Sequence, residues 1–323
     1  MSSPTVAIQA EGMVKRYGPV TAVNDVNLTV PAGTVHAVLG PNGAGKTTTV
    51  RMLATLLRPT SGSAKIFGYD VVRDATAVRS LIGVTGQYAS VDNDLSAYEN
   101  LTIFARLVGL SRKQAKVRTD ELLEEFSLTD VARRPLKNFS GGMRRRLDLA
   151  ATLISKPPLI FLDEPTTGLD PRTRVDMWNT VRRLVAQGST ILLTTQYLEE
   201  ADELADRITV IDRGAVVAEG TAIELKESIG RSVFTVVVDD PEQHQRAIGI
   251  VERITCAPVN NIAAGRIATN HADASSATTV LLALQQAGIT VRELGLSRPD
   301  LNEVFFALTG DPQGQSDTTG EAA

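Results

Sequence analysis

The chain has 323 residues and a mass of 34.5 kDa, which exceeds the usual size of one domain, so we expect a large domain and a smaller appendage. Hydrophobic residues make up 43% and charged residues 22%, as in average soluble globular proteins and unlike disordered or collagen-like chains. The formal net charge is -4 and no long Lys/Arg run occurs. We therefore expect no nucleic acid partner.

The single cysteine and the apolar runs bear on the compartment. Cys256 cannot form an internal disulfide, which suits a reducing cytosol, and we expect a buried, unreactive thiol. Residues 1–4 lack the basic and apolar regions of a signal peptide, and no apolar run approaches the roughly 20 residues that span a bilayer. We expect the chain itself to stay out of the membrane.

Alternating strand and helix patterns from Val6 to about Gly220 are typical of an α/β domain. The runs 159–162 and 190–195 are apolar enough to form strands that are buried on both faces at the centre of a parallel sheet. The predicted strands are 34–39, 159–162 and 190–195, and the predicted helices include 120–126 and 173–186. The polar, helix-rich part at about 88–155 is interpreted as an inserted helical subdomain of a domain covering 1–228.

After Gly230 a second, smaller set of elements follows. The predicted order is strand 232–238, helix 241–251, strand 265–269, helix 275–287 and strand 290–296. A last helix at 300–308 has apolar residues at helical spacing and is expected to pack on this sheet. We interpret 229–310 as a small C-terminal α/β domain, and the polar tail 311–323 as disordered.

Residues 40–47 read GPNGAGKT and fit the G-x-x-x-x-G-K-[ST] pattern between an apolar strand and the helical run 48–57. The glycines allow a tight turn with inward N–H groups, and a helix N-terminus adds positive potential where phosphates bind. The alternative is a glycine-rich turn with a solvated lysine. Lys46 would neutralise the β- and γ-phosphates, and the Thr47 hydroxyl would ligate Mg²⁺. The candidate ATP-binding residues here are Gly40, Pro41, Asn42, Gly43, Ala44, Gly45, Lys46, Thr47 and Thr48.

Residues 159–164 read LIFLDE, an apolar strand that ends in two carboxylates. Both are thereby delivered to the carboxyl edge of the sheet, where ligands of open α/β folds bind. Asp163 is predicted to support the Mg²⁺ shell and Glu164 to polarise an attacking water, since phosphoryl transfer needs mainly positioning and charge stabilisation. Alone, such a pair would more often be a helix cap or a turn, but the phosphate loop upstream favours the catalytic interpretation.

Together these motifs resemble the ATP-binding cassette (ABC) family from Val6 to about Gly220. The resemblance implies a P-loop NTPase cassette with a mixed sheet core and a helical subdomain. Ser140-Gly141-Gly142 resembles the signature loop, which in the family closes over the γ-phosphate held by the opposite subunit; this implies a homodimer of cassettes. Gln87 resembles the Gln loop, which contacts Mg²⁺ and communicates with the membrane domain.

Three further positions are compared with the family pattern, and one of them, Gln196, departs from it. Tyr17 resembles the aromatic residue that stacks on adenine, although an ordinary half-buried tyrosine is the alternative. Gln196 stands where the family usually has a histidine; it can hydrogen-bond a phosphate oxygen or water but cannot carry a proton or positive charge, which leaves two alternatives, slower hydrolysis or another distribution of the catalytic roles. It remains a candidate catalytic residue with Glu164 and Lys46. Leu169-Asp170 resembles the loop that links the two sites of the dimer.

Residues 194–202 (TTQYLEEAD) and 299–310 (PDLNEVFFALTG) are similar to exporter ATPases of the daunorubicin-resistance type. This resemblance implies an ATPase, with ATP and Mg²⁺ as cofactors, at the cytoplasmic face of the membrane. It would power efflux of a hydrophobic drug, polyketide or lipid through separately encoded permease subunits. We expect the coupling surface near 88–107, and a C-terminal domain that assists dimerisation or regulation or acts as a brace. The alternatives are a soluble ABC ATPase and a low-turnover nucleotide-sensing module.

Overall fold

The computed structural model describes residues 5–85, 91–228, 233–238, 240, 243–256, 259–263, 266–269, 274–297, 301 and 304–305. The chain divides into two compact units, Met1–Thr221 and Ala222–Ala323. Gln87, much of the helix predicted at 300–308 and the tail predicted to be disordered lie outside the described residues. Within the described part of the chain, no helix combines the length and apolar composition needed to cross a bilayer.

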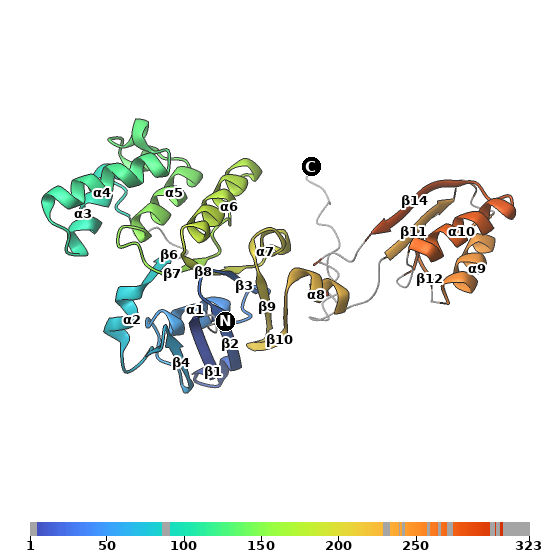
Figure 1. Ribbon diagram of the computed structural model, residues 1–323, viewed down its shortest axis with the longest axis horizontal. Coiled ribbons are helices and arrows are strands. Elements are labelled where there is room, and N and C mark those ends of the chain that lie inside the picture. Colours follow the sequence, from blue (N-terminus) through green and yellow to red (C-terminus); the bar gives the residue numbers. More distant parts are fainter. Residues whose placement is uncertain are drawn as a thin grey trace, which may run out of the picture. The chain divides into compact units, whose positions relative to one another are not determined.

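A six-stranded, largely parallel sheet forms the centre of the first unit (Figure 1). Its order is β10 (Ala215–Gly220), β9 (Arg207–Asp212), β3 (Val35–Leu39), β8 (Thr190–Thr195), β7 (Leu159–Asp163) and β6 (Ile82–Thr85), with only β10 antiparallel to its neighbour. Every residue of β3, β7 and β8 is buried. The strands predicted in these three regions are confirmed, and their carboxyl ends meet at one edge of the sheet.

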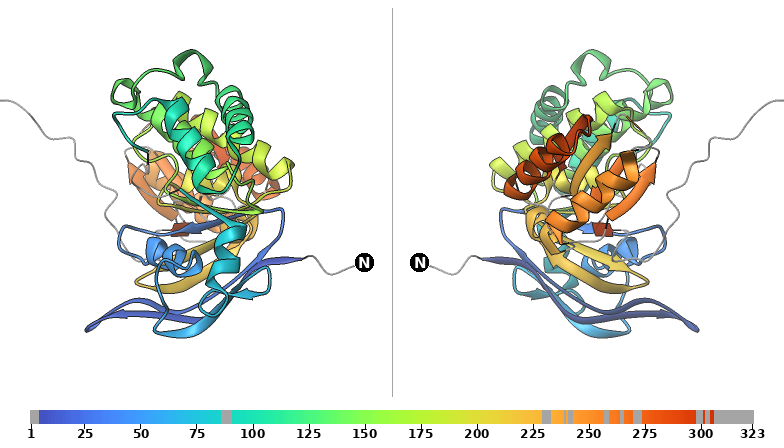
Figure 2. Two further views of the ribbon diagram at one scale, coloured as in Figure 1. Left: turned by 90° about the vertical axis from the view of Figure 1, so that its left-hand side faces the viewer. Right: turned by 90° about the vertical axis from the view of Figure 1, so that its right-hand side faces the viewer.

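A second sheet of the first unit is antiparallel and was not anticipated strand by strand. It is built from β1 (Val6–Tyr17), β2 (Val20–Pro31), β4 (Ser61–Ile66) and β5 (Tyr69–Asp70) in the order β2-β1-β4-β5. One apolar core joins it to α1 (Lys46–Leu53) and to one face of the parallel sheet, through residues such as Met13, Met52 and Phe161. Figure 2 shows it (blue) on the side of the unit away from the green helices. The phosphate-loop helix is therefore clamped between two sheets.

The helical subdomain consists of α3 (Ala97–Leu107), α4 (Arg112–Glu125) and α5 (Gly141–Thr152), with two short 3₁₀ turns at Thr129–Val131 and Leu136–Asn138. Capping boxes begin α3 at Ser96 and α4 at Ser111, because each serine hydroxyl accepts from the third helical N–H while Glu99 or Gln114 reaches back. The helix predicted at 120–126 is the end of α4. The remaining helices of the unit are α2 (Ala75–Leu81), α6 (Pro171–Ala186) and α7 (Leu198–Leu204).

The second unit has the element order β11 (Val233–Val238), α9 (His244–Thr255), β12 (Val259–Ala263), β13 (Arg266–Thr269), α10 (Ala274–Gln286) and β14 (Val291–Ser297), preceded by α8 (Ala222–Ser228). The strands form an antiparallel sheet in the order β12-β13-β11-β14, the βαββαβ arrangement of ferredoxin-like units. Phe234, Val236 and Ile267 on the sheet pack with Val251 and Leu284 on the helices. The sheet was predicted except for β12, where Asn260 and Asn261 weaken the strand pattern.

The prediction of a buried Cys256 is wrong. The residue follows the last turn of α9 in a left-handed conformation with φ 52°, and its side chain is exposed. A residue just past a helix end that turns the chain in this way faces outward, because the last turn no longer carries it against the sheet. The thiol is therefore accessible, although its pairing with another cysteine of this chain remains impossible.

His36 on β3 is a buried polar residue at the centre of the parallel sheet. Its Nε2 lies 2.8 Å from the Thr209 hydroxyl on β9, and the ring is 1% exposed. Burial, with a smaller contribution from the nearby Arg207 guanidinium, lowers the pKa of His36 from 6.5 to about 4. The neutral imidazole is thus the form compatible with the folded sheet.

We predict that His36 makes the fold sensitive to acid. Because its folded pKa lies below its unfolded value, its contribution to stability is complete above pH 6.5 and is lost as the pH falls towards 4. At about pH 4.5 the expected loss is roughly 2–3 kcal/mol relative to neutral pH. Chemical denaturation of the wild type and of His36→Gln at both pH values measures it. An equal loss of stability in both proteins would contradict the assignment.

Candidate functional site

The phosphate loop connects β3 to α1 and is held by close backbone contacts. The Gly40 N–H donates to the Thr195 carbonyl at 3.3 Å, and a Cβ on Gly40 would lie 2.3 Å from the Ile211 carbonyl oxygen. Gly45 has φ 107°, and a Cβ there would lie 2.5 Å from the Ala22 carbonyl oxygen. Both positions therefore require glycine. No side chain caps α1 at Gly45, so the N–H groups of its first turn can bind an anion.

Lys46 is buried at the start of α1, with only 4% of the residue exposed. Its Nζ donates to the carbonyls of Gly40 at 2.7 Å and Pro41 at 3.1 Å, and lies 3.7 Å from Glu164 Oε1. Burial lowers the pKa of Lys46, while the Glu164 and Asp163 carboxylates oppose this change. A cation is thus kept inside the hollow of the loop and paired with the carboxylate that ends the next motif.

The Asp163 carboxylate joins the two halves of the site. Its Oδ1 accepts from the Thr47 hydroxyl of α1 at 3.1 Å and from the Thr194 hydroxyl of β8 at 2.5 Å. The residue is 4% exposed. The pairing of Asp163 with Thr194 across β7 and β8 puts the two side chains at the same edge of the sheet. Sequence analysis identified Thr47 and Asp163 but missed Thr194, for which a threonine at the end of a buried strand was the only signal.

Glu164 follows β7 in a conformation unusual for this residue type, with φ 48°. Its N–H donates to both the carbonyl and the hydroxyl of Thr194, each at 3.1 Å. Its side chain accepts from the Thr167 hydroxyl at 3.2 Å and is 8% exposed. These contacts hold the carboxylate 3.7 Å from the Lys46 Nζ, beside the phosphate loop.

Hydroxyl and carboxylate oxygens are the ligands that Mg²⁺ prefers. Thr47 and Asp163 bring one of each together beside the phosphate loop. No cluster of three or more His, Cys, Asp or Glu side chains able to hold a metal occurs among the described residues. That composition fits an ion that binds through one or two protein oxygens and completes its shell with phosphate oxygens and water. The residues therefore fit a Mg²⁺–nucleotide complex.

Of the other predicted site residues, Gln196 lies beside this centre and Tyr17 lies on the hairpin that leads to it. Gln196 directly follows β8, whose last two residues contact Asp163, Glu164 and Gly40, and it is half-buried. Tyr17 ends β1, is 48% exposed, and has the Lys15 Nζ 5.3 Å from the centre of its ring. The hairpin that carries Tyr17 leads to Ala22, against which Gly45 packs. Gln87 lies outside the described residues.

The predicted signature loop is exposed at Ser140 and Gly141 and packed internally at Gly142. Ser140 caps α5 by accepting from the Met143 N–H at 3.3 Å, and Ser140 and Gly141 are both exposed. Gly142 packs on the start of α6, where a Cβ would lie 2.5 Å from the Thr173 Cγ2. Asp170 caps α6 through the Thr173 N–H at 3.0 Å. Ser140-Gly141-Gly142 and Asp170 thus form one surface, available to a second copy.

Arg145, to which sequence analysis assigned no role, reaches this centre from α5. Its Nε donates to the Pro165 carbonyl and a terminal nitrogen donates to the Asp163 carbonyl, each at 2.9 Å. The two carbonyls belong to the residues on either side of Glu164. No periodicity in the sequence could have indicated this contact, because it joins two segments of different subdomains.

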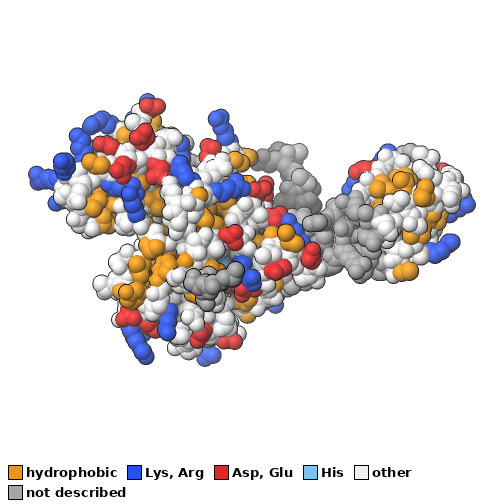
Figure 3. Space-filling view, viewed as in Figure 1, with side chains coloured by type: hydrophobic (Ala, Val, Ile, Leu, Met, Phe, Trp, Pro, Cys, Tyr) orange, Lys and Arg blue, Asp and Glu red, His pale blue; other side chains and the backbone are white. Residues whose placement is uncertain are grey.

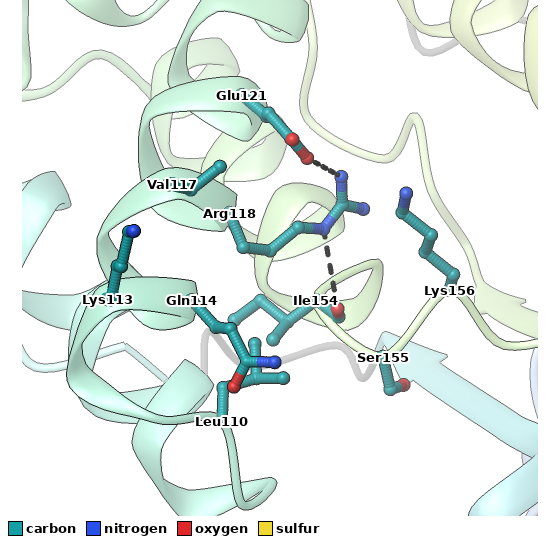
Figure 4. Close-up of a pocket in the computed structure, with 9 residues that line it drawn as sticks. All are labelled: Leu110, Lys113, Gln114, Val117, Arg118, Glu121, Ile154, Ser155 and Lys156. Carbon is teal, nitrogen blue, oxygen red and sulfur yellow. Dashed lines mark hydrogen bonds and ion pairs between the residues drawn. The ribbon is translucent and has the colours of Figure 1, made fainter.

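A pocket of about 460 Å³ lies elsewhere in the helical subdomain (Figure 4). Arg118 of α4 crosses it and donates to the carbonyls of Leu153 at 2.7 Å and Ile154 at 3.4 Å, and pairs with Glu121 at 2.9 Å. The apolar lining comes from Leu110, Val117 and Ile154. This arginine fastens α4 to the end of α5. We therefore interpret the pocket as a gap between packed elements of the helical subdomain.

Comparison with known proteins agrees with this geometry. The ABC transporter family model matches residues 23–167. A daunorubicin resistance ATP-binding protein, DrrA3 of Streptomyces coeruleorubidus, is 51% identical over 94% of this chain and 96% of its own. The daunorubicin/doxorubicin resistance ATP-binding protein DrrA of Streptomyces peucetius is 48% identical over 100% of this chain and 98% of its own.

Solved structures share the fold of the first unit. The ATP-binding subunit of an ABC transporter is 28% identical, with a TM-score of 0.62 over 69% of this chain and 93% of its own. A dimeric ATP-binding cassette in a post-hydrolysis state, bound to ADP and Pi, is 25% identical, with a TM-score of 0.61 over 66% of this chain and 98% of its own.

The parallel sheet, the phosphate loop and the carboxylates at the end of β7 define a P-loop ATPase of the cassette class. The chain belongs to the ABC transporter family, among the ATP-binding proteins of the daunorubicin-resistance type. It is the ATP-binding subunit of a transporter, an ATPase whose activity is coupled to transport.

We predict that the Thr194 hydroxyl is needed for turnover. Replacing it in Thr194→Val removes a donor to the Asp163 carboxylate and an acceptor for the Glu164 backbone N–H, so the carboxylate and the Glu164 turn each lose an orienting contact. We expect kcat for ATP hydrolysis to fall at least about tenfold, because small misplacements of catalytic groups have large effects. Thr194→Ser keeps the hydroxyl and serves as the matched control. Equal kcat values for the two variants would rule this role out.

Proposed function

We propose that two copies of this chain bind MgATP, close head to tail, and use hydrolysis to drive export through separate permease subunits. The observation that carries the proposal is the joining of the phosphate loop to the two carboxylates. Lys46 lies 3.7 Å from Glu164, and Thr47 bonds Asp163 at 3.1 Å. These pairs link the half of the site that binds phosphate to the half suited to hydrolysis.

In this proposal the loop 40–48 surrounds the phosphates with N–H groups, and Lys46 turns from its own loop carbonyls to the β- and γ-phosphates. Thr47, Asp163 and Gln87 hold Mg²⁺, which when bound neutralises phosphate charge and orients the transferred group. Tyr17 stacks on the base, and because stacking accepts either purine it does not select ATP over GTP.

Glu164 is proposed to orient and polarise the attacking water, and Gln196 to hydrogen-bond that water or a γ-phosphate oxygen. The left-handed backbone of Glu164 and its contacts with Thr194 and Thr167 keep the carboxylate at one place before the nucleotide arrives. Such preorganisation is what phosphoryl transfer asks of a protein, since the reaction depends on positioning and charge rather than on a covalent intermediate.

The second copy completes the site in this scheme. Ser140, Gly141 and Gly142 present an exposed serine hydroxyl and a helix N-terminus, groups that can bind the γ-phosphate of an ATP held by the partner. Support comes from the dimeric cassette bound to ADP and Pi, to which the first unit is similar. Closure would bring Asp170 and its neighbours to the same interface.

The proposed cargo is a hydrophobic drug, polyketide or lipid, handled by the permease rather than by this chain. The names of the relatives support this class, since two of them are daunorubicin or doxorubicin resistance proteins and another is a Nod factor export protein of Burkholderia orbicola, 37% identical over 94% of this chain. The proposed location is the cytoplasmic face of the membrane, through the permease subunits.

The permease is proposed to dock on the segment 88–107, of which residues 91–107 are described. Helix α3 exposes apolar side chains there, with Ile103 47% and Leu107 75% exposed, and Val108 follows at 53%. Lys and Arg side chains gather around the helical subdomain (Figure 3). Apolar groups bordered by charge are suited to a protein partner.

We propose residues 1–228 as the cassette, with its helical subdomain at about 88–155, and 229–310 as a domain that regulates or assists dimerisation or acts as a brace. The division of the chain near Thr221 supports separate units. Gln196 keeps a second function open, that of a nucleotide-sensing module with little turnover, because glutamine cannot carry the charge of the usual histidine.

We predict that Glu164→Gln binds MgATP but loses hydrolysis, because the amide cannot polarise water as the carboxylate does. The variant is expected to accumulate as an ATP-bound dimer, measured by size-exclusion chromatography with light scattering, while the wild type turns over. Lys46→Ala serves as the control that fails to bind. Binding without turnover by the wild type, even with its permease, would instead support the sensing module.

We predict that Leu107→Asp weakens permease binding without loss of nucleotide binding. Leu107 is 75% exposed in the isolated chain, and the substitution places a charge where the proposed contact with the permease is apolar. Co-purification of tagged permease measures this, with Leu56→Asp, an exposed position after α1, as the matched control. Equal recovery of permease with both variants would exclude α3 as its docking site.

A further inference from the structure

Arg145 of α5 hydrogen-bonds to the backbone of the turn that carries Glu164. One guanidinium bridges the Asp163 and Pro165 carbonyls, each at 2.9 Å, and so spans the residue between them. Arginine suits this contact because its rigid fork offers several donors in one plane. A lysine offers a single point of charge, and a glutamine is too short to span both carbonyls.

The turn held by Arg145 needs such support. Glu164 has φ 48°, a conformation that is unfavourable for a residue with a Cβ and persists only when the surroundings hold it. From β8, Thr194 accepts from the Glu164 N–H; from α5, Arg145 donates to the flanking carbonyls. The backbone of the turn is therefore held by two different elements.

Arg145 also lies on the helix that begins with the proposed signature loop. Ser140 caps α5, and Arg145 follows five residues later, about 8 Å along the axis. Gly142 packs directly on Thr173 at the start of α6. A displacement of α5 therefore moves the Ser140–Gly142 surface and the guanidinium together, since a helix of this length shifts as one element.

We infer that Arg145 is a positioning residue that fixes the Glu164 turn and makes its geometry depend on the position of α5. The inference rests on the proposed function, in which Ser140–Gly142 bind the ATP of the partner and Glu164 serves the ATP of its own chain. Occupancy of one site then orders the catalytic carboxylate of the other, through one helix and one side chain. This gives a physical route for cooperativity between the two ATP sites.

The test compares Arg145→Gln with Arg118→Gln. Each variant removes a guanidinium that belongs to the helical subdomain and donates to two backbone carbonyls. The carbonyls that Arg118 bonds are those of Leu153 and Ile154, away from Glu164. For Arg145→Gln we expect kcat to fall at least about tenfold with the MgATP Kd changed less than about threefold. The Hill coefficient of the ATP dependence should approach one. For Arg118→Gln we expect kcat and Hill coefficient of the wild type at reduced thermal stability.

A double-mutant cycle with Glu164→Gln separates the possible failures. If Arg145 acts through Glu164, adding Arg145→Gln to Glu164→Gln causes little further loss of turnover. Losses that multiply, or a kcat for Arg145→Gln equal to that of Arg118→Gln, would overturn the inference while leaving the proposed function intact. Wild-type turnover by Glu164→Gln alone would instead overturn the proposed role of Glu164. Arg145→Lys supplies the same comparison if the glutamine variant does not fold.

Discussion

The bonding of the Asp163 carboxylate by Thr47 and Thr194 is the interaction on which the site depends. It joins the phosphate-loop helix, the strand that ends in the carboxylates and the neighbouring strand β8 at a single oxygen. That oxygen is buried, where a carboxylate is stable only if its acceptor capacity is used. The same requirement that satisfies the buried charge therefore brings the Thr47 hydroxyl, the Asp163 carboxylate and the Glu164 turn into one place.

The architecture around this point follows from burial. Strands β3, β7 and β8 are buried along their whole length, and the polar side chains that contact the site, Asp163 and Thr194, lie at the carboxyl ends of β7 and β8. Helix α1 lies between the parallel sheet and the antiparallel sheet and shares one apolar core with both. The phosphate loop is thus rigid at its base, while its N–H groups remain available at the sheet edge.

The helical subdomain has a different character. Its exposed signature surface and exposed apolar residues on α3 offer contacts to other chains, while Arg118 holds α4 to the end of α5 internally. Arg145 joins α5 of this subdomain to the turn that carries Glu164.

The sequence by itself determined the class of protein, the phosphate loop, the carboxylate pair and the central strands, because each is encoded by residues adjacent in the chain. Periodicity and glycine spacing act over a few residues, so β8 was predicted at its observed bounds. Only the tertiary structure decided the roles of Thr194 and Arg145, the antiparallel packing of β1 and β2, and the exposure of Cys256. These depend on contacts between distant segments, and no local pattern specifies which distant carbonyl a side chain will meet.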